Sequence, residues 1–118
     1  MNLEEILKEM VQAVEGGLGA MIMGLDGLAV AQHLAGEIPD FEGISIECCG
    51  FVKKLIQLAN SMAQSIFNQF AFITSKYQIL CYMVSSDYFV IFVITREGNF
   101  GKGRYLTKLA ARKIKKEI

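Results

Sequence analysis

Side chains that could carry out catalysis are few in this sequence. The chain has one histidine, His33, and three cysteines, Cys48, Cys49 and Cys81. A lone histidine cannot assemble a metal site, and no serine or cysteine is spaced to act as its nucleophile. An odd number of cysteines without C-x-x-C spacing argues against a zinc site and against a disulfide framework. We therefore expect reduced, packed cysteines, no metal and no catalytic residue, in a cytoplasmic protein.

Neither of the two glycine-rich segments of the chain matches a phosphate-binding motif. A P-loop requires a serine or threonine after its lysine, but here Lys102 is followed by Gly103. The segment 16–19 precedes a predicted strand and opens no helix, so it does not fit the dinucleotide-binding arrangement. These glycines are typical of helix stops, caps and close-packing points, and no cofactor is expected.

Length and composition narrow the class of protein. The chain has 118 residues, a net charge of zero and 53% hydrophobic residues, which predicts a single domain over residues 1–118. Zero net charge argues against a nucleic-acid partner. The longest apolar run, 88–94, falls far short of the ~20 residues that a membrane span needs. The apolar excess therefore indicates a surface that is buried against another copy or another protein.

Hydrophobic periodicity predicts an α+β fold. The predicted elements are a helix over 3–14, strands 18–24 and 28–33, a long helix from about 41 to about 69, strands 70–75, 77–84 and 88–94, and a helix after Asn99. Asn2 and Asn99 are typical helix caps, and Asp26-Gly27 is typical of a hairpin turn. We expect a five-stranded antiparallel sheet with the long helix on one face and the N- and C-terminal helices on the other.

Charge is divided between the two ends of the chain. Residues 1–47 hold nine acids and one base, and residues 100–118 hold seven bases and one acid. The simplest interpretation pairs the basic last helix with the acidic first helix on one face of the sheet.

The long helix carries apolar residues over about half of its circumference, which is wider than the ~100° stripe that one packing surface requires. It is therefore expected to contact its own sheet and a second surface, and strand 70–75 is too apolar to remain a bare sheet edge. The predicted interface of a homodimer consists of Phe51, Leu55, Leu58, Met62, Phe70, Phe72 and Thr74.

The polar side of the same helix contains amides, hydroxyls and two lysines but no acid. Charge depletion is typical of interface cores, although an ordinary solvent face is the alternative. The predicted partner-binding residues are Lys53, Lys54, Gln57, Asn60, Ser61, Gln64 and Asn68.

Three segments carry a resemblance to a known family: the first hairpin, 19–31, the long helix before a three-strand meander, and 99–109 at the start of the last helix. Over its whole length the chain resembles the roadblock/dynein light chain family, which is profilin-like in fold, and in particular its bacterial MglB-like members. The resemblance implies dimers formed through the long helix and the next strand. It also implies binding of a small Ras-like GTPase, whose GTP hydrolysis MglB-like dimers promote without an arginine finger.

Two functions are therefore open. The first is a non-enzymatic dimeric module that scaffolds or regulates a Ras-like GTPase. The second is a small-molecule sensor of the PAS or profilin-like type. The apolar long helix favours the first, because a sensor needs a cavity with convergent polar groups and the sequence offers no such set.

Overall fold

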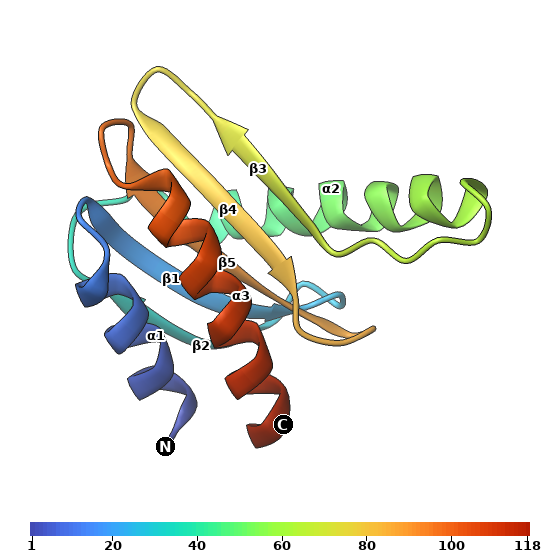
Figure 1. Ribbon diagram of the computed structural model, residues 1–118, viewed down its shortest axis with the longest axis horizontal. Helices are drawn as coiled ribbons and strands as arrows, with labels where there is room; N and C mark the ends of the chain where they lie inside the picture. The colour runs from blue at the N-terminus through green and yellow to red at the C-terminus, as the bar shows by residue number, and fades with distance from the viewer.

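The computed structural model describes residues 1–118 and contains three helices and five strands (Figure 1). Their order is the predicted one. The elements are α1 (Leu3–Ala13), β1 (Gly17–Gly24), β2 (Ala29–Leu34), α2 (Phe41–Ser61), β3 (Gln69–Ile73), β4 (Tyr77–Met83), β5 (Tyr88–Thr95) and α3 (Phe100–Glu117).

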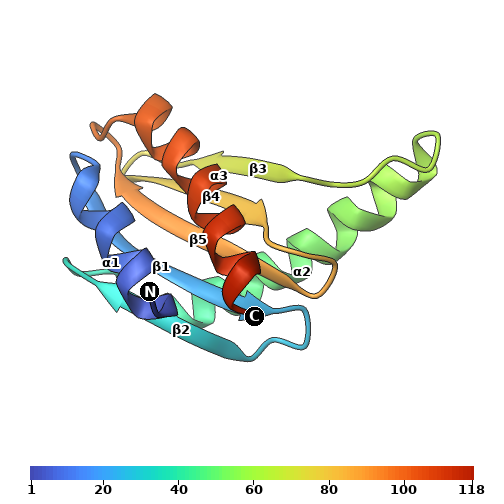
Figure 2. The same cartoon turned by 60° about the horizontal axis from the view of Figure 1, so that its bottom comes forward.

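The five strands form one antiparallel sheet in the order β2-β1-β5-β4-β3, which confirms the predicted fold class. Helices α1 and α3 lie side by side on one face, and α2 crosses the opposite face (Figures 1 and 2). Strands β1 and β5 are almost entirely buried because helices cover them on both sides. Strands β2 and β3 are the two edges.

The face under α1 and α3 holds the larger core cluster, which includes Leu7, Ile22, Phe92 and Ile114 at zero exposure. Both helices begin at the predicted caps. The side-chain oxygen of Asn2 accepts a hydrogen bond from the Glu5 amide at 2.8 Å, and that of Asn99 accepts from the Lys102 amide at 3.1 Å. These bonds satisfy amides that a helix start would otherwise leave unpaired.

Helix α3 can lie close to the sheet because Gly103 faces it. A Cβ at this position would come within 3.1 Å of Leu80 Cδ1. The turn that leads into α3 is held by Gln78, whose buried Nε2 donates to the carbonyls of Thr95, Arg96 and Gly98 at 3.0–3.1 Å. One side chain of β4 therefore fixes where the last helix begins.

The predicted charge pairing between α1 and α3 has only a small counterpart. Glu9 of α1 and Lys113 of α3 line the shallow groove between the helices, alongside mainly apolar neighbours. Arg104 and Lys108 instead line a separate cavity with Gln69 of β3. Apolar packing, with Met10 and Ala110 in the shared core, holds the two helices together.

Helix α2 ends at Ser61, so the prediction that it continues to about residue 69 is wrong. Ala63 and Gln64 both adopt φ of +57°, a left-handed conformation that stops an α-helix. The hydroxyls of Ser61 and Ser65 donate to the carbonyls of Leu58 and Ala59, which satisfies acceptors that the helix end leaves free.

A smaller difference concerns the ends of one strand. Strand β3 covers Gln69–Ile73 instead of 70–75, because Thr74 uses its hydroxyl in the turn to β4, accepting from the amides of Lys76 and Tyr77. No helix is long and apolar enough to cross a bilayer.

Candidate dimer and partner-binding surface

Helix α2 packs on the sheet mainly with its first half. Its buried residues are Phe41, Ser45, Cys48, Cys49 and Val52, and none after Val52 is buried. Cys49 Sγ lies 3.5 Å from the carbonyl oxygen of Leu25, which ties this half of the helix to the β1–β2 turn. The helix has 21 residues and so spans roughly 30 Å. Its second half extends past the sheet (Figure 1).

The extended half exposes a continuous apolar flank. Phe51, Leu58 and Met62 are 58%, 56% and 61% exposed, and Leu55 between them is half-buried. The four residues recur at spacings of three and four, so they lie on one side of the helix. Monomeric soluble proteins rarely leave such a contiguous apolar surface in water.

Strand β3 continues this apolar flank. Phe70 and Phe72 alternate onto the face of β3 that looks toward α2, and Phe72 is 54% exposed. Together with Phe51 and Leu55 they line a groove of about 250 Å³, of which Glu47 is the single charged residue. The outer edge of β3 pairs with no strand, so its backbone groups are free to extend the sheet.

Six of the seven predicted interface residues thus lie on one surface, which we call the α2–β3 surface: Phe51, Leu55, Leu58, Met62, Phe70 and Phe72. Thr74 lies just beyond the end of β3. Sequence reasoning missed Ile44 and Ile79, which also line the groove. Ile44 shares the helical stripe of Phe51, and Ile79 is the register partner of Phe72 in β4, so both signals were present in the sequence.

All seven predicted partner-binding residues are exposed, but they do not form a single helical face. Gln64 and Asn68 lie in the 62–68 connection, so their predicted place on the long helix is wrong. Gln57, Asn60, Gln64 and Asn68 line a groove of about 630 Å³ that is closed on its other side by Met83–Ser86. Lys53, Lys54 and Ser61 lie outside this groove.

The three cysteines are free and buried. Burial raises the pKa of the Cys48 thiol to about 11, and the pKa of Cys81 is raised well above its usual value for the same reason. Both thiols are therefore protonated at neutral pH and are poor nucleophiles. No group of three His, Cys, Asp or Glu side chains is placed to hold a metal ion.

Solved structures of other proteins share the fold of this chain. MglC from Myxococcus xanthus superimposes with a TM-score of 0.71 at 29% identity, over 100% of both chains. The gliding protein MglB from Thermus thermophilus reaches a TM-score of 0.87 at 15% identity, over 97% of this chain and 86% of that one. A Roadblock/LC7 domain from Streptomyces avermitilis gives 0.77 at 16% identity, over 99% and 98%.

The chain has a roadblock-family, MglB-like fold. No family model and no curated protein sequence matches it. The two matches below 25% identity establish the roadblock fold alone, and the agreement with MglC extends over the full length of both chains.

Proposed function

We propose that this roadblock chain is a non-enzymatic homodimer that scaffolds or regulates a small Ras-like GTPase. The observation that carries the proposal is the α2–β3 surface, where an exposed apolar flank runs into an unpaired strand edge. Such a surface is expected to be covered in solution, and a second copy offers the same apolar groups and the same free edge.

The proposed dimer has two-fold symmetry. Strand β3 pairs with β3 of the other copy, and the two α2 flanks pack together, which buries Phe51, Leu58 and Phe72. A two-fold axis makes one self-complementary patch sufficient, because each copy supplies what the other lacks. The assembly is then closed at two chains.

The proposed GTPase contact lies on the polar residues that the dimer leaves exposed. Gln57, Asn60 and Gln64 line the larger groove in each copy, and the symmetry axis would bring two such sets to one side of the assembly. Neutral amides lose little on desolvation compared with charges, so they suit a docking surface. Lys53 and Lys54 would speed association with an acidic partner surface.

A paired substitution tests the GTPase contact. Gln57→Glu with Asn60→Asp adds two negative charges at exposed positions, and it is expected to weaken binding of a Ras-like GTPase from the same organism by roughly tenfold or more. The matched control is Gln12→Glu with Gln32→Glu, which adds the same charge at exposed positions of α1 and β2. Both variants should remain dimers.

Equal GTPase affinity of the Gln57/Asn60 variant and the parent would contradict this contact. The sensor alternative has less support, because apolar clusters fill the space between the central strands and the helices on both faces.

A further inference from the structure

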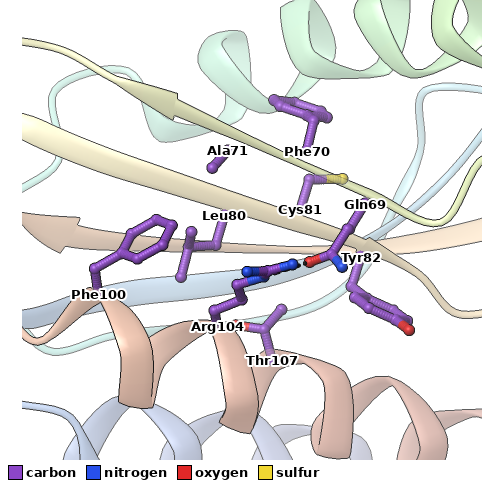
Figure 3. Close-up of a pocket in the computed structure, with 9 residues that line it drawn as sticks. All are labelled: Gln69, Phe70, Ala71, Leu80, Cys81, Tyr82, Phe100, Arg104 and Thr107. Atoms are coloured by element: carbon purple, nitrogen blue, oxygen red, sulfur yellow. Dashed lines mark hydrogen bonds between the residues drawn. The ribbon is translucent and has the colours of Figure 1, made fainter.

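The face opposite α2 has a second groove, between α3 and β3. Helix α3 packs on β4 and β5 and leaves the neighbouring part of β3 uncovered. The resulting cavity has a volume of about 270 Å³ (Figure 3), and a second hollow of about 470 Å³ continues it along the outer flank of α3. We call this the α3–β3 groove. The residues that define it are Gln69, Ala71, Leu80, Tyr82, Phe100, Arg104, Tyr105 and Lys108.

Arg104 crosses the α3–β3 groove. Its Nε donates to Oε1 of Gln69 at 3.1 Å, so the side chain is extended from α3 toward β3 (Figure 3). A guanidinium has five N–H donors, and this bond uses one of them. Arg104 is exposed and no acidic residue lines either part of the groove. Its remaining N–H donors therefore have no carboxylate of this chain to bind within the groove.

Further bases extend the positive charge along the same flank of α3. Lys108 lies one turn after Arg104 and lines the outer hollow, and Arg112 follows by one more turn. Lys115 reaches the adjacent Met83–Ser86 turn. The spacing of Arg104, Lys108, Arg112 and Lys115 places them in one stripe, which runs beside the groove.

Both apolar and polar side chains line the groove. Leu80, Ala71 and the ring of Phe100 line one end, and Tyr82 and Thr107 lie toward the other (Figure 3). The Thr107 hydroxyl donates to the Gly103 carbonyl of its own helix at 2.6 Å. The inner cavity, at about 270 Å³, has room for one or two side chains of a polypeptide, and the hollow of about 470 Å³ along α3 has room for the chain that carries them.

We infer that the α3–β3 groove binds an acidic, extended segment of a partner protein that also carries an apolar side chain. The apolar side chain enters the cavity beside Phe100 and Leu80. A carboxylate of the segment pairs with Arg104, and further carboxylates follow toward Lys108. Arginine is suited to this contact because its planar fork holds a carboxylate through two parallel hydrogen bonds.

The charges around the groove favour a narrow segment over a broad anionic surface. Helix α1 lies beside α3 on the same face of the sheet (Figure 2) and exposes Glu4, Glu5 and Glu9. A flat lipid surface or a nucleic-acid backbone laid across α3 would meet these carboxylates at close range. A single extended strand within the groove avoids them.

The inference adds a second partner to the proposed function. The α3–β3 groove lies on the opposite side of the sheet from α2, so a GTPase on α2 and an acidic segment at Arg104 and Lys108 would approach each other only near Lys115, which also lines the α2 groove. One copy could then hold two proteins at once. Loss of either interaction would leave the other intact.

Selection from a library of random peptides on the immobilised full chain tests the inference. The selected peptides are expected to be rich in aspartate and glutamate and to share an apolar residue. Arg104→Gln with Lys108→Gln should weaken a selected peptide by about 10- to 100-fold, as expected for the loss of charge-assisted hydrogen bonds.

The matched control is Lys8→Gln with Lys113→Gln, which removes the same two charges from exposed positions of α1 and of the flank of α3 that faces α1, and it should leave peptide affinity unchanged. Circular dichroism and the melting temperature establish that both variants fold. Equal loss in the two variants, or selected peptides without acidic residues, would overturn the inference. So would binding of anionic vesicles or RNA that depends on Arg104 and Lys108 while no peptide does.

Discussion

The two faces of the sheet differ in how completely the chain covers them. Helices α1 and α3 together bury the central strands on their face, where Leu7, Phe92 and Ile114 are fully inaccessible to water. Helix α2 covers the other face mainly with its first half, and Phe51, Leu58 and Met62 remain more than half exposed. Both faces are apolar, so the difference lies in the number and placement of helices.

This contrast separates two roles for apolar residues. Under α1 and α3 they stabilise the single chain, and on the α2–β3 surface they are available for association. A composition of 53% hydrophobic residues cannot distinguish the two roles. Substitutions on the two faces should therefore affect different measurements, and the four predictions below are ordered from the largest expected effect to the smallest.

Phe92→Ala should have the largest effect on folding. The ring of Phe92 is fully buried between the sheet and the α1–α3 pair, so its removal leaves a cavity. We expect the free energy of unfolding to fall by about 3–5 kcal/mol, as measured by denaturant titration. The folded fraction should keep the oligomeric state of the parent. A loss below about 1 kcal/mol would show that packing under α1 and α3 contributes little to the stability of the chain.

Phe72→Lys should act on association. A lysine ammonium at the centre of the α2–β3 surface would lose its water in the proposed dimer, and the one carboxylate in the groove, Glu47, would offset that cost only in part, so the dimer should weaken by at least about 30-fold. Light scattering of the parent should give twice the monomer mass of 13.1 kDa at micromolar concentration, and that of the variant should approach the monomer mass.

A matched control is Val30→Lys on the other edge strand, where Val30 is 44% exposed. This variant should remain a dimer. A parent protein that scatters as a monomer would contradict the proposed role of the α2–β3 surface.

Gln78→Met should have a moderate, localised effect. The substitution removes the buried amide that holds three carbonyls of the turn before α3. We expect a loss of about 1–2 kcal/mol, together with faster hydrogen exchange in the first turn of α3. Exchange that changes equally throughout the sheet would show that the amide stabilises the whole domain and not this turn.

Cys48 should give the smallest effect, confined to alkaline pH. Burial raises its pKa from 9.0 to about 11, so the folded state holds the thiol proton more tightly than the unfolded state does. Its contribution is fully present below pH 9 and decreases as the pH rises through this window. From about pH 8 to about pH 10 the loss should be about 1 kcal/mol.

Comparing the pH dependence of unfolding in the parent and in Cys48→Ala measures this contribution. Parallel curves for the two proteins would show that the groove beside Phe51 admits water freely.

The fold followed from patterns that burial imposes on sequence. Alternation and apolar runs predicted all five strands, because β1 and β5 are covered on both faces, and the caps Asn2 and Asn99 fixed two helix starts. The end of α2 did not follow, since Met62 and Ile66 continue a helical spacing that the left-handed Ala63 and Gln64 interrupt. Exposed apolar residues give the same periodic pattern in the sequence as buried core residues do.

Only part of the candidate site could be predicted from the sequence. Exposed apolar residues on α2 were found because their stripe is wider than one packing surface needs. The α3–β3 groove was not found, because it depends on where α3 crosses the sheet. That position is determined by Gly103 against Leu80 and by the Gln78 amide, contacts between elements distant in sequence.

The irregularity in β2 limits how far copies of this chain can assemble. Opposite β1 the register shifts between Ile22 and Met23, which leaves Val30 as an extra residue, whereas the ladder between β3 and β4 is regular throughout. A bulged edge is a poor template for another strand. Strand pairing at β3 would therefore end with two copies and a continuous sheet of five strands from each. The outer rims of that proposed sheet would resist growth into fibrils, so pairing through an apolar strand would not lead to aggregation.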